Sequence, residues 1–341
     1  MKRAIIILVI LSGFIIKGGT GFAQDTINSK TEKSNFESYT DKLDIYSFGI
    51  SKFNNFKVSA NGSKTSLHYN PNEKTNLGLG FNYKWLGLGI GFNFGFLNSD
   101  QDLYGTTKSI DLQVDVYRRD ILYSGNFQYY EGYYWKNPDD YLHNWNTADS
   151  VQIRPDIKTA TLGLSGIYVF NNENFSFKAA FQNTERQIKS AGSWLLAGKF
   201  SIYGISADSS LIPVELHELY SNIKDIKGVS AINMGGAGGY AYTYLLGEYF
   251  YFSGAVMFGL NLQAVSRTNL DDENIGGPIK ISTNAQVRLA IGCNKPKAFY
   301  GFSAVIDSYN IKNTEDSAFE YNYGKIRFFY GRRFDVTSKQ N

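Results

Sequence analysis

Cysteine, proline and histidine are scarce in this chain of 341 residues. The only cysteine, Cys293, excludes an intramolecular disulfide, and its position excludes acylation of a mature N-terminal cysteine. Stability outside the cytoplasm would therefore have to come from the fold itself. Against 6 prolines stand 25 phenylalanines and 25 tyrosines, an aromatic-rich composition that is typical of β-strands.

An excess of one charge and a second long apolar run are also missing. The 34 basic and 31 acidic side chains leave a net charge of +3, too balanced for the broad positive field of a nucleic-acid-binding protein. Beyond residue 23, no stretch approaches the roughly 18 apolar residues of a transmembrane helix. We therefore expect no nucleic-acid partner, and we expect the exported chain to be either soluble or a membrane β-barrel.

The N-terminus has the pattern of a secretory signal peptide. Met1 to Arg3 form a basic region, Ala4 to Ile16 form an apolar region, and Gly21 to Ala23 provide a small-residue cleavage site. The sequence predicts a signal peptide over residues 1–23, cleaved after Ala23. Residues 24–41 are polar and show no period, which predicts a flexible periplasmic lead-in.

Alternation with a period of two dominates the chain from about Leu43 onward. The stretch Asn76–Asn98 reads NLGLGFNYKWLGLGIGFNFGFLN, with large apolar residues at every second position and mostly Gly or Asn between them. A soluble β-sandwich also alternates, but its strands usually run for about five or six residues. Here the runs often reach about ten to sixteen residues, the length that a tilted strand needs to cross a bilayer.

Aromatic residues gather at the ends of these runs. Two such groups are Tyr129, Tyr130, Tyr133, Tyr134 and Trp135, and Tyr240, Tyr242, Tyr244, Tyr249 and Tyr251. Amphipathic rings at both interfaces form the girdles of outer-membrane barrels, so their placement favours the barrel over the sandwich.

The connections fall into two length classes that alternate, as periplasmic turns and extracellular loops do in such barrels. Short ones are predicted at 83–85, 118–120, 171–173, 245–248 and 293–296, and long ones at 98–106, 136–157, 266–278 and 310–317. Between the turns at Asn171 and Leu245 lie three candidate strands, 175–184, 193–206 and 229–244. If the middle one does not cross, the barrel has about twelve strands, and if it hides a hairpin, about fourteen.

We therefore predict an all-β fold, a transmembrane antiparallel β-barrel over residues 42–334. About twelve strands are expected, with fourteen as the alternative. Residues 335–341 are predicted to be a polar tail beyond the last strand.

No residue cluster forms a specific catalytic or cofactor motif. Gly236 to Ala241 loosely fits a dinucleotide fingerprint, but an alternating aromatic segment follows it instead of a helix. The histidines His68, His143 and His217 show neither a serine pairing on a strand nor the spacing of a zinc protease. We predict no catalytic residue, no cofactor and no metal ligand set. The acidic loop Asp271–Asn274 lacks the spacing of a calcium loop, and whether it binds a metal stays open.

Charged residues on the predicted inner faces of the strands are more informative as a set. They carry both signs and lie on different predicted strands: Asp111, Asp115, Lys178, Arg288 and Arg327. Ion pairs between them would plug a small barrel with its own side chains, and the alternative is that they line a selective pore. The many glycines on the inner face of Asn76–Asn98 favour the plug.

Several strings resemble a known protein family. They are Tyr69–Asn72 leading into Asn76–Phe92, then Tyr130–Tyr134, Gln187–Ser193 and Gly238–Tyr242. Together they are similar to an uncharacterised outer-membrane family of Bacteroidota, a domain of unknown function (number 4421), over most of the mature chain. The resemblance implies export to a Gram-negative outer membrane and a membrane barrel, and it carries over no catalytic residue.

The predicted function is that of an outer-membrane barrel which is not an enzyme and serves as a channel, a surface-binding protein or a structural protein. The alternatives are a barrel enzyme that modifies lipid and a secreted soluble β-sandwich. The expected partners are outer-membrane lipid and, during biogenesis, the barrel-assembly machinery. No small-molecule ligand can be named from the sequence.

Overall fold

The computed structural model describes residues 35–60, 65–72, 75–84, 86–94, 100–142, 152–312 and 317–336. The predicted signal peptide, residues 24–34 of the lead-in, His143 and the end of the polar tail lie outside these residues. Within the described ranges, every helix is too short or too polar to cross a membrane. All of these residues belong to one unit of the chain, Ser34–Asn341.

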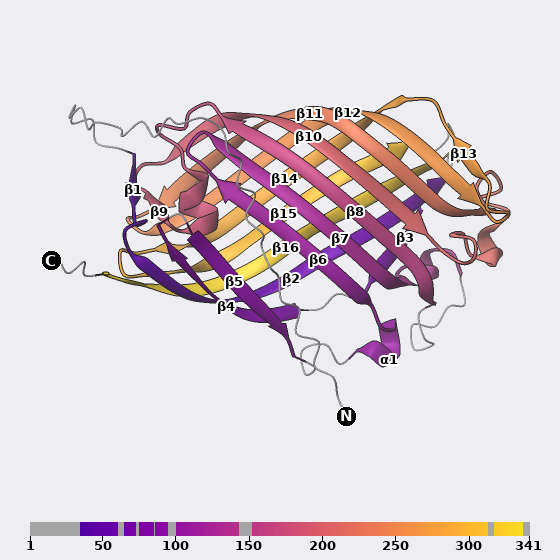
Figure 1. Ribbon diagram of the computed structural model, residues 1–341, viewed down its shortest axis with the longest axis horizontal. Helices are drawn as coiled ribbons and strands as arrows, with labels where there is room; N and C mark the ends of the chain where they lie inside the picture. Colours follow the sequence, from indigo (N-terminus) through magenta and orange to yellow (C-terminus); the bar gives the residue numbers. More distant parts are fainter. Residues whose placement is uncertain are drawn as a thin grey trace, which may run out of the picture. The chain divides into compact units, whose positions relative to one another are not determined.

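Most of the described chain is β-structure (Figure 1). The strands are β1 (Phe36–Ser38), β2 (Leu43–Ala60), β3 (Ser66–Pro71), β4 (Thr75–Tyr83), β5 (Leu86–Asn93), β6 (Lys108–Tyr117), β7 (Ile121–Trp135), β8 (Ile153–Val169), β9 (Glu185–Gln187), β10 (Ala191–Ser206), β11 (Ile226–Leu246), β12 (Phe250–Asn269), β13 (Asn274–Gly276), β14 (Lys280–Asn294), β15 (Ala298–Lys312) and β16 (Ser317–Phe334). The helical elements are short: α1 (Gln101–Tyr104), η2 (Pro138–Asp140), η3 (Lys178–Gln182) and η4 (Val214–Leu216).

A ring of 10 antiparallel strands closes the barrel. Around the ring, the order is β2, β16, β15, β14, β12, β11, β10, β8, β7 and β3, and β3 pairs again with β2. Four further strands, β4, β5, β6 and β13, complete the 14-stranded sheet outside the ring. The antiparallel barrel predicted from the alternation is confirmed, and its closure excludes the sandwich.

The strand count agrees with the predicted range once interrupted strands are joined. β3 pairs with the stretch Phe56–Ser59 of β2, and β4 pairs with the stretch Asp44–Ser51. β3 and β4 are therefore two parts of one crossing. Counting them once, and leaving out the 3-residue β13, reduces the 14 strands of the sheet to 12 crossings.

The two ends of the barrel differ in their connections. We call the end that carries Leu43 and Phe334 the terminal end, and the opposite end the loop end. The short connections after β4, β6, β11 and β14 lie at the terminal end, whereas the longer connections after β5, β7, β10 and β12 lie at the loop end. Gly247 lies in the left-handed region at φ 73°, where a side chain would be strained. The predicted asymmetry of short turns and long loops is confirmed at these connections, but the long loop predicted at 310–317 is wrong, because β15 runs to Lys312 and β16 begins at Ser317.

One connection at the terminal end departs from the prediction. Residues 170–190 form turns, the π-helical turn η3 and the short strand β9, which pairs with β1. The predicted turn at 171–173 is present, but the predicted strand 175–184 is wrong, and the middle run is the full strand β10. The phenylalanines Phe175, Phe177 and Phe181 are all buried, and so are Ala179 and Ala180 between them. The segment is surrounded by the barrel, so its apolar residues are buried on all sides. Their spacing resembles the alternation of a strand although the segment does not form one.

A seam interrupts the sheet between β5 and β6. β5 pairs only with β4 and β6 pairs only with β7 among the described residues, and the ring closes past them through β3 and β7. We call these two facing strands, Leu86–Asn93 and Lys108–Tyr117, the seam. One edge of each strand is thus without a backbone partner in the described part of the sheet.

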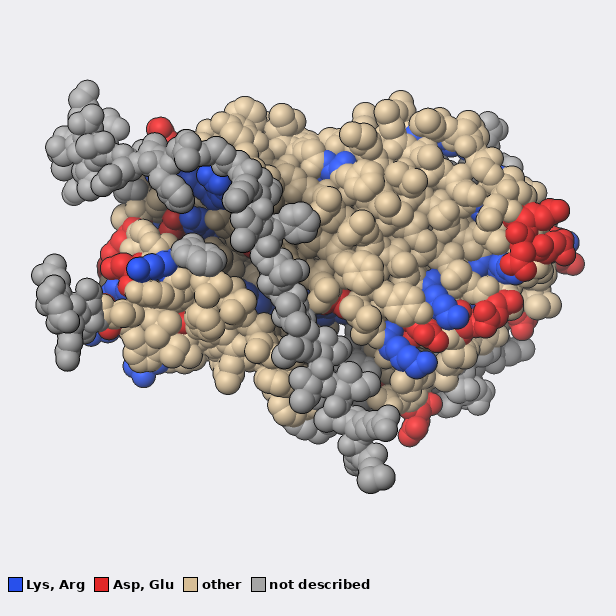
Figure 2. Space-filling view, viewed as in Figure 1, with Lys and Arg blue, Asp and Glu red and all other residues tan. Residues whose placement is uncertain are grey.

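The outer surface of the barrel is apolar. Large exposed side chains point outward from every wall, among them Leu79, Ile90, Leu164, Trp194, Met234, Phe258, Leu260, Ile291 and Phe328. In Figure 2, the charged side chains gather toward the two ends of the view and the surface between them is almost free of charge. This is the lipid-facing belt of a transmembrane barrel.

Candidate functional site

The lumen of the barrel is polar, and four of the five predicted interior charges point into it. Asp111 and Asp115 lie on β6, Arg288 on β14 and Arg327 on β16. Lys178 is the exception, because it lies in η3 and pairs with Glu185 at 3.6 Å instead of standing on a strand. The prediction that Lys178 lies on a strand is wrong, because residues 175–184 do not form a strand.

Asp111 is the centre of one polar cluster. Its carboxylate accepts hydrogen bonds from the Gln128 amide at 2.7 Å and the Tyr130 hydroxyl at 2.6 Å. The Lys52 ammonium lies 3.3 Å from the carboxylate and donates to the Asp111 carbonyl at 2.7 Å. Since Lys52 comes from β2, the ion pair ties β6 to β2 across the inside of the seam.

Asp115 forms the next cluster along β6. It pairs with Lys325 of β16 at 2.7 Å and with Arg288 of β14 at 3.7 Å, and it accepts a hydrogen bond from Ser124 at 2.5 Å. One carboxylate therefore serves two cations from two other strands. Side-chain bonds of this kind hold β6 in place where backbone pairing to β5 is missing.

A third ion pair lies on the fully paired side of the barrel. Lys199 of β10 pairs with Asp307 of β15 at 3.1 Å, and the Gln286 amide donates to the same carboxylate at 2.7 Å. Lys199, Asp307, Lys52 and Lys325 were not among the predicted interior charges. These residues stand at the inward-facing positions of alternating strands, as Lys199 does between Gly198 and Phe200. That position in the alternation is the signal that could have identified them.

Side chains fill the lumen at mid-height. The cavity that remains beside these clusters has a volume of about 30 Å³ and is lined by residues from six strands, among them Asp115, Ser124, Asn126, Gln286, Arg288 and Lys325. One water molecule needs roughly 10–15 Å³, so the cavity has room for about two.

Gly78 and Gly80 of β4 face two aromatic rings of β2. A Cβ atom added at Gly78 would lie 2.4 Å from the Phe48 ring, and one at Gly80 would lie 2.4 Å from the Tyr46 ring. The space that these glycines leave is therefore filled by neighbouring side chains. It is not a passage along the wall.

At the terminal end, the segment 170–190 is held inside the barrel by hydrogen bonds to its backbone. The Tyr251 hydroxyl donates to the Ala180 carbonyl at 3.0 Å, and the Arg327 guanidinium donates to the Phe181 carbonyl at 3.0 Å. The Arg333 guanidinium donates to the Asn183 carbonyl. We call residues 170–190 the terminal plug.

The segment before β2 adds to the terminal plug through Tyr39. Its backbone N–H donates to the Thr184 carbonyl at 2.9 Å, and its hydroxyl donates to Glu37 at 2.9 Å. Burial of the ring and the bond to Glu37 raise the pKa of Tyr39 to about 12. The side chain is therefore neutral and remains a hydrogen-bond donor at physiological pH.

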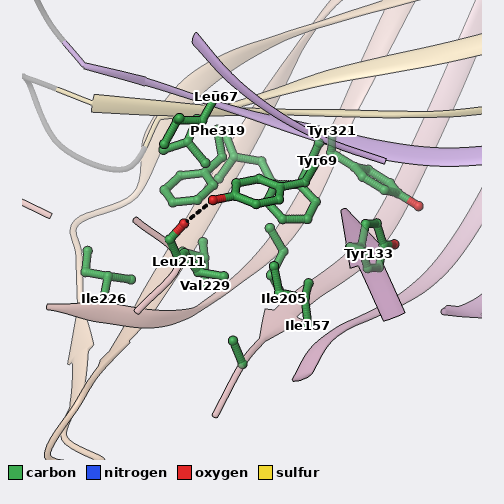
Figure 3. Packing of buried hydrophobic residues seen from close by; sticks show 14 of the residues in the cluster. Leu67, Tyr69, Tyr133, Ile157, Ile205, Leu211, Ile226, Val229, Phe319 and Tyr321 are labelled. Carbon is green, nitrogen blue, oxygen red and sulfur yellow. Dashed lines mark hydrogen bonds between the residues drawn. The ribbon is translucent and has the colours of Figure 1, made fainter. Parts of the chain in front are cut away.

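At the loop end, the connection 207–225 folds over the barrel mouth onto an aromatic cluster (Figure 3). The Tyr69 hydroxyl donates to the Leu211 carbonyl at 2.7 Å, the bond drawn in the figure. Tyr69 stacks on Phe56 with ring centroids 4.9 Å apart, and Tyr203 stacks on Tyr321 at 3.8 Å. Only the single turn η4 is helical in this loop. The buried cluster closes the mouth.

A serine and a histidine meet on the outer face of β3. The Ser66 hydroxyl and His68 Nε2 are 3.0 Å apart, a pairing that the sequence analysis missed although Ser-x-His places both on one strand face. Tyr69 next to them points into the lumen, so this pair points away from it. No carboxylate in the described chain hydrogen-bonds to the imidazole. His217 lies in the loop 207–225, with its Nε2 3.2 Å from the Ile212 carbonyl.

The acidic loop is exposed and internally bonded. Asp272 pairs with Lys227 at 2.7 Å, and the Asn269 amide donates to Glu273 at 3.0 Å. Within the described ranges, no group of 3 or more His, Cys, Asp or Glu side chains is placed to hold a metal ion. Gly236 to Ala241 lie inside β11, paired on both sides, so no helix opens there.

Comparison with known proteins gives a family match over residues 30–334, to the family described as Domain of unknown function (DUF4421). No curated protein matches the chain. Among solved structures, it is similar to the outer membrane protease OmpT from Escherichia coli, at 11% identity and a TM-score of 0.38, covering 87% of this chain and 98% of that one.

Two other solved structures are also similar. The translocator domain of autotransporter NalP from Neisseria meningitidis has 8% identity and a TM-score of 0.33, with 85% of this chain and 88% of that one covered. The attachment invasion locus protein Ail of Yersinia pestis has 9% identity and a TM-score of 0.23, with 86% and 99% covered. Likenesses of this size assign no activity.

Proposed function

The chain belongs to the family described as Domain of unknown function (DUF4421), and we propose from its geometry that it is a sealed outer-membrane barrel without catalytic activity that works through its loop end. The terminal end would face the periplasm and the loop end the cell surface. The proposal includes export through the signal peptide, with cleavage after Ala23, and folding by the barrel-assembly machinery of a Gram-negative cell.

The observation that carries the proposal is that side chains and loop segments bond across the lumen at three levels. The terminal plug occupies the terminal end, the clusters around Asp111, Asp115 and Asp307 fill the middle, and the loop 207–225 covers the mouth. A porin needs a water-filled channel, and its polar groups line that channel instead of bonding across it. This arrangement favours a binding or structural role over a channel.

The loop end supports a binding role. β11 and β12 have 21 and 20 residues, about twice the length needed to cross a bilayer, so they extend beyond it. In the loops at this end, Val214 is 77% exposed and Ile279 is 72% exposed. A contiguous apolar patch is a feature of protein-binding surfaces, and we assign these two side chains to such a patch.

Two observations support the absence of catalytic activity. The Ser66 and His68 pair has no orienting carboxylate among the described residues, and it lies on the outer face of the wall. A Ser-His hydrolase needs a third group that holds the imidazole in the right tautomer.

Single-channel recording in a planar bilayer tests the sealed lumen. The wild-type barrel should insert without steady conductance steps, whereas a general porin reconstituted in parallel should give them. A second recording should use a variant that lacks residues 208–224, because the middle clusters alone should still keep it closed. Stable open-channel steps from the wild-type protein would show that the lumen conducts and would overturn the proposal.

A further inference from the structure

The cavity beside Arg288 is a built polar site. Arg288 is 2% exposed, and its Nη2 donates to the Ser124 hydroxyl at 3.2 Å. Its Nε and Nη1 atoms have no hydrogen-bond partner among the described residues, and the Tyr117 hydroxyl is another polar group that interacts with the guanidinium. Buried N–H donors are nearly always bonded, so these two call for an acceptor in the cavity.

The cavity is lined by two cations, Arg288 and Lys325, and two carboxylates, Asp115 and Asp307, but Asp307 also pairs with Lys199. Four cations meet at mid-height, Lys52, Lys199, Arg288 and Lys325, against three carboxylates, Asp111, Asp115 and Asp307. Asp115 lies closer to Lys325, at 2.7 Å, than to Arg288, at 3.7 Å. Arg288 therefore has the weakest ion pair of the four cations. An uncompensated cation in a low-dielectric interior is costly unless an anion accompanies it.

The cavity has room for a small anion. Its volume of about 30 Å³ is about twice the roughly 10–15 Å³ that one water molecule needs, which suits a monatomic ion. The lining offers hydroxyl and amide donors from Ser165 and Asn126 in addition to the guanidinium. These are the donors that a halide ion accepts from in a dry site.

We propose that this cavity binds one halide-size anion, such as chloride, which neutralises Arg288 and completes the polar network of the lumen. The anion would accept hydrogen bonds from Arg288 Nε and Nη1. It would therefore stabilise the folded barrel wherever the halide is present. The proposal does not depend on the function of the loop end or on whether the barrel conducts.

Bromide is the probe for the direct test. Diffraction data from crystals of the full barrel grown in sodium bromide, measured at the bromine absorption edge, should show an anomalous peak within hydrogen-bond distance of Arg288 Nε or Nη1. The competing occupant is a water that bridges Arg288 and the unpartnered amide oxygen of Gln286. Density without an anomalous signal at that place would identify water and overturn the proposal.

Stability in solution gives an independent readout. At equal ionic strength, the wild-type unfolding midpoint should be about 2–5 °C higher in sodium bromide or chloride than in sodium gluconate. The variant Arg288→Met should lose this difference. The matched control is Arg327→Met, which removes a lumen guanidinium that does not line the cavity and should keep the difference. Equal midpoints for the wild-type protein in both salts, or a retained difference in Arg288→Met, would contradict the site.

Discussion

The wall that runs from β7 through β12 to β2 and the wall at the seam are held by different forces. In the first, each strand pairs with two neighbours through its backbone, and the side chains of the lumen are added to a closed sheet. At the seam, β6 has one backbone neighbour among the described strands and is tied to β2 and β16 by Asp111 and Asp115. The same kind of ion pair therefore supplements closure in one wall and replaces it in the other.

The comparison of two lysines should show the largest difference. Lys199→Met removes a side chain that is 1% exposed and leaves the buried Asp307 without its cation, which should lower the free energy of unfolding by about 3–5 kcal/mol. Lys52→Met, at the seam, removes a side chain that is 23% exposed, while Asp111 keeps hydrogen bonds from Gln128 and Tyr130; a loss of about 1 kcal/mol is expected.

Urea unfolding of the barrel in lipid vesicles, followed by tryptophan fluorescence, measures both variants. Equal losses would mean that the lumen is equally dry on the two sides. A larger loss for Lys52→Met would mean that the seam-side pair is the essential one, against the comparison drawn from the structure.

Two glycines provide a smaller, steric contrast. A Cβ atom at Gly259 of β12 would lie 2.1 Å from the Gly236 carbonyl oxygen, a backbone atom that cannot move aside. Gly259→Ala should therefore lower stability by about 2 kcal/mol. At Gly91 of β5, the nearest atom would be the Asn76 Cβ at 3.5 Å, so Gly91→Ala should change stability by less than about 0.5 kcal/mol. The midpoint of heat-modifiable gel migration reports both effects, and a strongly destabilised Gly91→Ala would show that the seam is closed.

Backbone hydrogen exchange is the mildest test. Amides of β5 that point into the seam should exchange roughly a hundredfold faster than those of β12, whose pairing is complete on both sides. Mass spectrometry of the barrel in lipid, with peptides that cover both strands, gives the rates. Equal protection of β5 and β12 would mean that β5 has a second partner in the membrane.

Alternation predicted most of the sheet because it depends only on residues two positions apart. The inward parity of Asp111, Asp115, Arg288 and Arg327 followed from the same local rule. The 175–184 segment was misplaced because its phenylalanines are buried by the barrel around them, and no local pattern distinguishes burial inside a plug from burial on one face of a strand. Its correction needed the contacts of Tyr251, which lies on a distant strand.

The amino-acid sequence was enough to predict the barrel, the two length classes of its connections and the mixed charge of its interior. These features depend on which residues alternate along a strand, and alternation is a local property of the chain. The partner of each charge was decided by the tertiary structure. Lys52 meets Asp111 across 59 residues and Lys325 meets Asp115 across 210 because the sheet closes and brings inward faces together. For the same reason, whether the glycines of Asn76–Asn98 line a passage or receive the rings of Tyr46 and Phe48 could be seen only once β2, β4 and β5 were packed side by side.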